Sequence, residues 1–394
     1  MKGEEESGFL AAKDKFHLAQ LLKEQNLILI SADEEGAKKA KGKTGFSLFP
    51  GVSVTEKLMF VRNLKVMISA GVPLPRSLEL LASQARSKKF RRTINEVKDE
   101  VVRGTNFSDA LLARSSVFSE IFGSMVKVGE ASGKLEEVLD LLANQMARQH
   151  ELSSKIKGAL VYPAVIIVAM SGIGAAMLLM VVPRIAETFK ELEIDLPATT
   201  RFVIWLGETL VSRWYLLAAL LIALPFLFFR FSKTKVGGKA LSFLSLRLPI
   251  ISLIVRKANS AQAIRTLGSL ISAGVPITRS LEILSESLGN VYYRESMKVA
   301  TEEVTKGRKL SEALSPYSFI YSPLAIQMIA VGEETGQTAE VLDKLASFYE
   351  DEAGEMTQNL TSIIEPVIML LIGGAVGFFA ISMVQPMYSM LGAM

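Results

Sequence analysis

Two stretches of this chain run for longer than a lipid bilayer is thick without one charged side chain. Gly158 to Pro183 is 26 residues long, and Pro366 to Met394 is 29. A helix of 26 residues rises about 39 Å, whereas the hydrocarbon core of a bilayer is about 30 Å thick. Both stretches therefore predict transmembrane helices, and the mean hydropathy of +0.33 agrees with a membrane protein.

A third, shorter candidate for a crossing lies at Trp214–Phe229, which has 16 uncharged residues. Arg213 and Arg230 flank it, and their long side chains can reach the two interfaces of a bilayer. The alternative is a buried core helix, because 16 residues is near the lower limit for a crossing. We expect transmembrane helices at 158–183, 214–229 and 366–394.

The distribution of charge predicts the orientation of these helices. Residues 230–257 carry seven basic side chains and no acidic one, whereas the loop 184–213 carries four basic and five acidic residues. Cytoplasmic loops are enriched in Lys and Arg, so the N-terminus and residues 230–365 are expected in the cytoplasm. The loop 184–213 and the C-terminus are then extracytoplasmic. The first residues hold three consecutive glutamates and no apolar stretch, so no secretory signal peptide is expected.

The chain also contains an internal duplication at a constant offset of 203 residues. ISAGVPLPRSLELL (68–81) matches ISAGVPITRSLEIL (271–284) at 11 of 14 positions, and VGEASGKLEEVLD (128–140) matches VGEETGQTAEVLD (331–343). Two such similar surfaces belong on the same side of a membrane, which requires an even number of crossings between them. This argument independently favours a crossing at 214–229.

Each copy of the duplication has the apolar spacing of helices and no alternation typical of strands. In the first copy the helices are expected near 54–69, 74–86, 88–103, 108–114, 119–130 and 134–157, with Ser108, and Ser311 in the second copy, as N-caps. The predicted fold is an all-α membrane protein with two cytoplasmic six-helix bundles, at 54–157 and 230–365, and three transmembrane helices. Residues 1–53 are expected to form a small accessory region and linker, with a helix at Phe16–Asn26 and a strand at Leu27–Ile30.

Composition excludes several classes of site. The chain has no cysteine and two histidines, far apart, which excludes disulfides, thiolate metal centres and a cysteine nucleophile. Gly42-Lys43-Thr44 resembles the end of a P-loop, but Ala37 stands where that motif needs glycine. A net charge of +4 is too small to imply nucleic acid. No catalytic residue, cofactor or metal is expected; the acidic run 350–352 with Glu355 is interpreted as a solvated helix face rather than a cation site.

Two repeated corners are the candidate functional positions. In V-G-E-x-[ST]-G the final glycine is expected to end one helix just before the next begins, and the glutamate either bonds across the corner or presents its charge to a partner. Catalysis by these glutamates would need a second acid or base, and none is patterned with them. The A-G-V-P corner is interpreted as a tight turn between helices. The corner residues are Gly71, Pro73, Gly129, Glu130 and Gly133, with Gly274, Pro276, Gly332, Glu333 and Gly336 in the second copy.

Small residues recur inside the predicted membrane helices, namely Ser171 and Ala175 in the first and Gly373 and Gly377 in the last. Such spacing allows helices to approach closely, either between copies of the chain, which predicts a homo-oligomer, or within one chain. None of the three membrane segments contains Asp, Glu, Lys, Arg or His, which disfavours a transporter or channel.

Together these features resemble the PilC/GspF family, the polytopic platform proteins of type IV pilus assembly and type II secretion. The resemblance is carried by the paired copies, the ISAGVP-x-x-RSLE and VGE-x-[ST]-G corners, and QPMYSM (385–390) after a Gly-rich helix. It covers about 54–394, with a looser match near 10–32 and a shorter N-terminal region than is usual.

The resemblance implies a protein of the cytoplasmic (inner) membrane that is not an enzyme. Its implied partners are a cytoplasmic hexameric assembly or retraction ATPase, prepilin or pseudopilin subunits, and other inner-membrane assembly proteins. Type IV pilus assembly is the leading hypothesis, and the F protein of type II secretion is the alternative. A transporter and a membrane-bound enzyme that uses Glu130 and Glu333 are the competing hypotheses from other classes.

Overall fold

The computed structural model describes residues 51–184, 187, 198–232, 234–248 and 251–391. The chain divides into two units, Met1–Gly51 and Val52–Met394. The helix and the strand expected within 1–53 lie outside the described residues, and the following description concerns the second unit.

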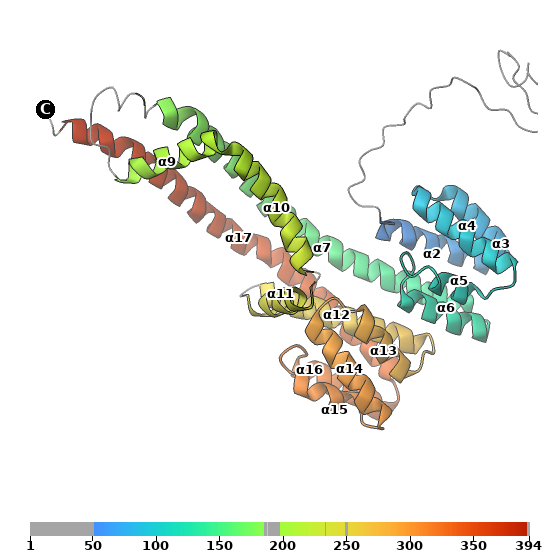
Figure 1. The fold of residues 1–394 in the computed structure, drawn as a ribbon. Coiled ribbons are helices and arrows are strands. Elements are labelled where there is room, and N and C mark those ends of the chain that lie inside the picture. Colours follow the sequence, from blue (N-terminus) through green and yellow to red (C-terminus); the bar gives the residue numbers. More distant parts are fainter. Residues whose placement is uncertain (1–50, 185–186, 188–197, 233, 249–250, 392–394) are drawn as a thin grey trace, which may run out of the picture. The chain divides into compact units, whose positions relative to one another are not determined.

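The first copy of the duplication consists of six helices. They are α2 (Val54–Ser69), α3 (Leu74–Gln84), α4 (Lys88–Val102), α5 (Phe107–Leu112), α6 (Glu120–Ser132) and α7 (Leu135–Ala176) (Figure 1). The first five lie within two residues of the expected bounds. The sixth joins the expected bundle helix (134–157) to the expected transmembrane helix (158–183) in one continuous helix.

The second copy repeats the first helix by helix. It consists of α12 (Ile251–Ser272), α13 (Ile277–Ser287), α14 (Val291–Thr305), α15 (Leu310–Leu314), the 3₁₀ turn η2 (Ser315–Tyr317), α16 (Pro323–Thr335) and α17 (Thr338–Leu391). Helices α13 to α17 each begin 203 residues after their counterparts α3 to α7. The described residues contain no strand, so the predicted all-α fold with two repeated bundles is confirmed.

Serine hydroxyls begin several of these helices. Ser53, Ser87 and Ser119 accept hydrogen bonds from the backbone N–H groups of Glu56, Phe90 and Phe122, at 3.1, 3.4 and 3.4 Å. These bonds satisfy donors that have no partner within the first turn of a helix. The sequence therefore specifies these helix starts locally.

Aromatic rings fill the centre of each bundle, with different chemistry in the two copies. In the first, Phe60, Phe90 and Phe118 pack with ring centroids 5.5 to 6.0 Å apart. In the second, Tyr293 and Tyr321 occupy the positions of Phe90 and Phe118, and their hydroxyls bond Ser260 and Ser296 at 2.9 and 3.0 Å. Burial raises the pKa of both tyrosines well above its ordinary value.

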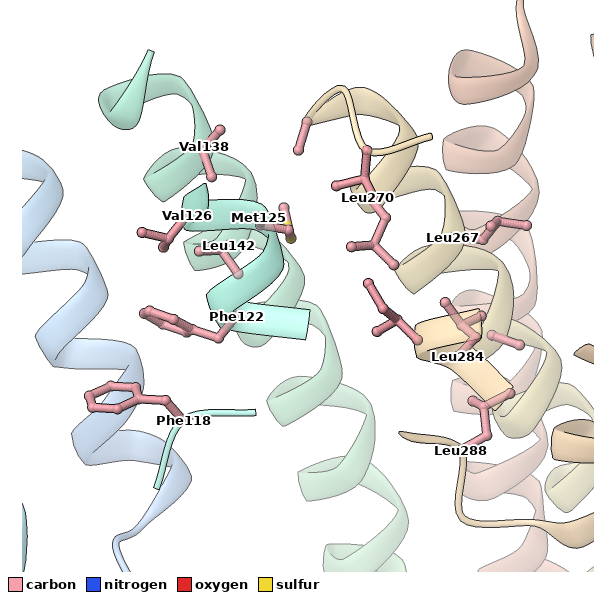
Figure 2. Close-up of a cluster of buried hydrophobic side chains, with 14 of the residues drawn as sticks. Phe118, Phe122, Met125, Val126, Val138, Leu142, Leu267, Leu270, Leu284 and Leu288 are labelled. Atoms are coloured by element: carbon pink, nitrogen blue, oxygen red, sulfur yellow. The ribbon is translucent and has the colours of Figure 1, made fainter. Parts of the chain in front are cut away.

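Side chains of the two copies belong to one buried hydrophobic cluster. Figure 2 shows Val138 and Leu142 from the first copy and Leu267, Leu270 and Leu284 from the second, all buried. Because the two bundles share this cluster, the interface between them is part of the apolar core of Val52–Met394.

Two helices of the described chain are long and apolar enough to cross a membrane. They are Leu135–Arg184, which comprises α7, the π-helical turn η1 (Met177–Val181) and three further residues, and Thr338–Gln385 within α17. Up to three crossings result if the bent pair Val236–Arg247 and Ile251–Ser272, at 112°, counts as one. The membrane character of the fold is thereby confirmed, with two or three candidate crossings.

The expected crossing at 214–229 falls on helix α10 (Trp214–Ser232). Within α10, the part Ala223–Ser232 is an apolar helix, but it is shorter than the two candidate crossings. α10 is followed by α11 (Lys235–Arg247), a helix outside the duplication whose Ser242 hydroxyl accepts a bond from the N–H of Val291 at 3.3 Å. The second bundle therefore has one helix more than predicted.

The segment 184–213 is not simply a loop. It contains α9 (Ala198–Ser212), in which the Thr200 hydroxyl donates to the carbonyl of Ser382 at 2.6 Å. The Phe202 ring meets the Phe378 ring at 6.5 Å. This helix, whose apolar run 202–206 packs against α17, was not predicted from the sequence, because charge counting does not reveal such a contact.

Candidate functional site

The glutamate of the first V-G-E-x-[ST]-G corner caps a helix. Glu130, near the end of α6, accepts hydrogen bonds from the N–H of Phe107 at 2.7 Å and from the N–H and hydroxyl of Ser108 at 3.0 and 2.7 Å. Phe107 and Ser108 begin α5. A carboxylate at this end of a helix satisfies free N–H donors and faces the positive end of the helix dipole.

The second corner has the same geometry. Glu333 on α16 accepts from the N–H of Leu310 at 2.5 Å and from the N–H and hydroxyl of Ser311 at 3.1 and 2.6 Å. In both copies the two carboxylate oxygens thus bond a helix start inside the same bundle. Each glutamate therefore caps a helix start. Its carboxylate bonds backbone N–H groups and a serine hydroxyl, which do not form the acid–base pair that the enzyme hypothesis requires.

The N-cap role expected for Ser108 and Ser311 is wrong. The N-caps of α5 and α15 are Asn106 and Lys309, and neither side chain makes a capping bond. The two serines lie two residues after these N-caps, and their hydroxyls donate to the glutamates. A charged carboxylate supplied by the next helix replaces the usual hydroxyl because it bonds two backbone donors at once.

The first glycine of the same corner permits close packing of two helices. A Cβ built on Gly129 would lie 2.9 Å from Val138 Cγ2 and 3.2 Å from the Cα of Leu135. At Gly332 the corresponding distances are 3.1 Å to Val341 Cβ and 3.2 Å to the Cα of Thr338. Each V-G-E corner therefore needs glycine for the contact between a bundle helix and the long helix that follows.

The last glycine of the corner ends the helix. Gly133 and Gly336 both have φ of +71° and follow the final residues of α6 and α16. This left-handed conformation is cheap only for glycine, and it turns the chain directly into α7 and α17.

The A-G-V-P corners join α2 to α3 and α12 to α13. Gly71 and Gly274 have φ of +75° and +88°, and Pro73 and Pro276 are the residues before the next helix. The surroundings of the two corners differ. A Cβ on Gly71 would meet no described atom within 4 Å, whereas one on Gly274 would lie 3.3 Å from Val128 of the first copy.

The small residues of the membrane segments lie on α7 and α17. Ser171 is exposed and Ala175 is half-buried. A Cβ built on Gly373 or on Gly377 would meet no described atom within 4 Å. Within the described part of the chain, the glycine pair is therefore not used for packing against another helix.

Two carboxylates in the acidic run of α17 form ion pairs with α12. Glu350 binds Arg265 of α12 through two bonds of 2.8 Å, and Glu352 pairs with Lys257. The side chains of Glu350 and Arg265 are only 12% and 10% exposed. The solvated-face interpretation is therefore wrong for Glu350 and Glu352, although Asp351 and Glu355 are exposed. The described residues contain no group of three or more His, Asp or Glu side chains placed to hold a metal ion.

Sequence reasoning missed the contacts between the two copies. Arg279 of α13 donates to Glu120 of α6 at 2.6 Å, and the Gln145 amide of α7 donates to the Thr266 hydroxyl of α12 at 3.2 Å. Gln145 is a polar residue that is buried on α7, and a buried polar side chain needs a hydrogen-bond partner. Nothing in its own sequence neighbourhood indicates the partner.

The match to a known protein family occurs twice in the chain, at the same offset as the repeated helices. The family model described as "Type II secretion system (T2SS), protein F" matches residues 60–183 and again residues 263–386, two ranges that are 203 residues apart. The chain belongs to the type II secretion system protein F family. Each match includes a bundle and the apolar helix that leaves it.

Relatives in this family carry two kinds of name. The type IV pilus assembly protein PilC of Thermus thermophilus is 32% identical over 385 residues, which cover 98% of this chain and 95% of the relative. PilC of Myxococcus xanthus is 32% identical over 345 residues, covering 88% and 82%. The type II secretion system protein F of Vibrio cholerae is 30% identical over 397 residues, covering 99% and 96%. The protein F family thus places this chain with the membrane machinery of pilus assembly and secretion.

Proposed function

We propose that this protein is the inner-membrane platform of a type IV pilus assembly machine. In this role a cytoplasmic hexameric assembly or retraction ATPase acts on the bundles, and prepilin subunits enter the filament at the membrane part. Other inner-membrane assembly proteins complete the site, and the chain itself carries out no chemical step. The relatives named PilC support the choice of pilus assembly.

One structural observation carries the platform role. Each bundle ends in a helix that continues into an apolar segment, as α7 (Leu135–Ala176) and α17 (Thr338–Leu391). Force or rotation applied to a bundle is transmitted along such a helix, because its backbone hydrogen bonds make it a stiff rod. Two long helices that leave two similar bundles suit a part that receives work from a partner.

The proposed topology places the N-terminus in the cytoplasm and the C-terminus outside it, with α10 as the middle crossing. The bent pair 236–247 and 251–272 is a poor crossing, because Arg265 of α12 makes its ion pair inside the second bundle. Alkaline phosphatase fused after residue 187 or at the C-terminus is expected to be active, and fused after residue 289 inactive. An active fusion at 289 would overturn the topology.

Deletion of the gene tests the function. Loss of surface filaments, restored by the wild-type gene, is the expected result, together with co-purification of the ATPase with the wild-type protein. Filaments retained in the deletion strain would refute the pilus role.

The F protein of a type II secretion system is the second candidate, since relatives from Vibrio cholerae and Aeromonas hydrophila carry that name. The same deletion strain separates the two. Loss of secreted proteins with normal filaments indicates secretion, and substrate flux through reconstituted protein would instead indicate a transporter.

A further inference from the structure

The two bundles meet through different faces. α6 and α7 of the first copy contact α12 and α13 of the second, together with the corner between those two helices, and α7 also packs against α17. Among the pairs between the copies are Glu120 with Arg279 at 2.6 Å, Gln145 with Thr266 at 3.2 Å, and Val128 with a Cβ built on Gly274 at 3.3 Å. A two-fold contact would also contain the reciprocal pairs, but Asn63 and Arg76 are exposed and a Cβ built on Gly71 would meet no described atom within 4 Å. The contact is therefore head-to-tail rather than two-fold.

Because the copies are duplicates, each face used in this contact exists a second time. The counterparts of Glu120, Val128 and Gln145 lie on the second copy and are Pro323, Val331 and Phe348, which we call the α16 face. These residues are exposed, and Val331 and Phe348 are large apolar side chains that are 50% and 43% exposed. The contacts of Phe348 are made inside its own copy, where Lys257 lies 5.9 Å from its ring centroid and the Tyr349 ring lies 5.6 Å away.

The counterparts of Thr266, Gly274 and Arg279 lie on the first copy and are Asn63, Gly71 and Arg76, which we call the α3 face. All three are exposed. The difference between the copies is clear at the alanine before each glycine, because Ala273 is 9% exposed in the contact whereas Ala70 is exposed. Val66 on the neighbouring α2 is 65% exposed, so this face also presents apolar surface.

The direction of the long helices makes the contact repeatable in a membrane. α7 and α17 both run from a bundle into an apolar segment, so the relation that takes the first bundle to the second preserves the direction of crossing. A further chain added by the same relation inserts its helices in the same direction. Head-to-tail contacts that close in this way form rings, and those that do not close form open arrays.

We propose that a second copy of this chain docks its α3 face on the α16 face of the first, repeating the contact that already joins the two bundles. The contact between chains lacks one ion pair, because Pro323 stands where Glu120 provides the carboxylate for Arg279. Contact between chains is therefore weaker than contact within a chain and is reversible. This inference does not depend on which filament or secretion system the protein serves.

Cross-linking of the full chain in membranes tests the proposal. Because the chain has no cysteine, its thiols are then those that the substitutions introduce. The variant Asn63→Cys/Phe348→Cys, treated with a flexible bis-maleimide, is expected to give a ladder of dimers, trimers and larger species. Each single variant stays monomeric, and the two singles expressed together stop at dimers. Gln145→Cys/Thr266→Cys is the positive control and cross-links within one chain.

Two results would overturn the proposal. One is a single variant that cross-links to itself, which indicates a two-fold contact. The other is the absence of a ladder while the internal control pair reacts. Val102→Cys/Phe319→Cys, at positions that are 65% and 46% exposed and belong to neither face as defined, measures random collision.

Charge variants provide an independent readout. Pro323→Glu restores the missing partner for Arg76 and is expected to raise the cross-linked fraction about two- to fivefold, as for an exposed ion pair. Val331→Glu is expected to lower it at least tenfold, while Val102→Glu leaves it unchanged. Equal effects of Val331→Glu and Val102→Glu would contradict the assigned face.

Discussion

Glu130 accepts both the backbone N–H and the hydroxyl of Ser108, at 3.0 and 2.7 Å, and so ties the end of α6 to the start of α5. The same relationship joins Glu333 to Ser311 in the second copy. A residue that looked free to contact a partner is thus engaged inside its own bundle. Partner contacts of these corners, if made, go through the residues around the glutamate.

Replacement of Glu130 by alanine is expected to destabilise the first bundle by about 2–3 kcal/mol, because two buried N–H donors lose a charged acceptor. Thermal unfolding of the purified protein in detergent, or resistance of the first bundle to a protease, measures the loss. Glu137→Ala is the matched control, since its side chain is 67% exposed and pairs only with Lys134. Equal effects of the two substitutions would contradict the capping role.

Replacement of Gly129 by alanine is expected to cost about 1–3 kcal/mol, as for overpacking of a core. The added methyl group would lie 2.9 Å from Val138 Cγ2, so α6 and α7 must separate. Gly158→Ala is the control, because open space surrounds Gly158 within α7. That substitution should leave the unfolding temperature unchanged or raise it, since alanine favours a helix. A harmless Gly129→Ala would show that the two helices have room to move.

Replacement of Arg265 by methionine is expected to destabilise the second bundle by about 3–5 kcal/mol, because Glu350 is left almost buried without its counter-charge. Lys344→Met is the control, because its pair with Glu340 is 68% and 58% exposed. Adding Glu350→Leu to Arg265→Met should recover part of the loss. Unfolding measured for the three variants decides whether the pair acts as one buried unit.

Acid is expected to weaken the first bundle through Glu100. Arg114 bonds this carboxylate at 2.8 and 2.9 Å and lowers its pKa below the usual 4.5. Because the folded-state pKa is the lower one, the pair contributes stability above about pH 4.5, and this contribution disappears as the pH falls below that value. Arg114→Met should therefore make stability less dependent on pH in this range. An unchanged acid transition would show that other carboxylates dominate.

Much of the fold follows from local patterns in the chain. Glycines with positive φ, serine N-caps and apolar spacing fix helix ends within a few residues, as at α2 and α3. The length of the uncharged runs indicates α7 and α17 as membrane helices. These signals are readable because each depends on residues that are close neighbours along the chain. The candidate corners were found in the same way, through their repetition at 203 residues.

Other features were hidden because their causes lie elsewhere in the chain. α9 was not predicted, since its apolar partner on α17 lies about 180 residues away. Glu350 was interpreted as solvated, because its counter-charge on α12 is distant in sequence. Glu130 was left with two interpretations, and only the position of α5 distinguishes them.

The helices, the duplication, the apolar segments and the absence of thiol chemistry are all readable from the amino-acid sequence, because they are properties of local composition or of self-comparison. Which copy of each duplicated face is covered depends on how the helices pack. Nearly identical corners have nearly identical local energies, so the sequence cannot distinguish Gly71 from Gly274. The packing of α6 and α7 against α12 and α13 makes that choice, burying one corner and leaving the other exposed.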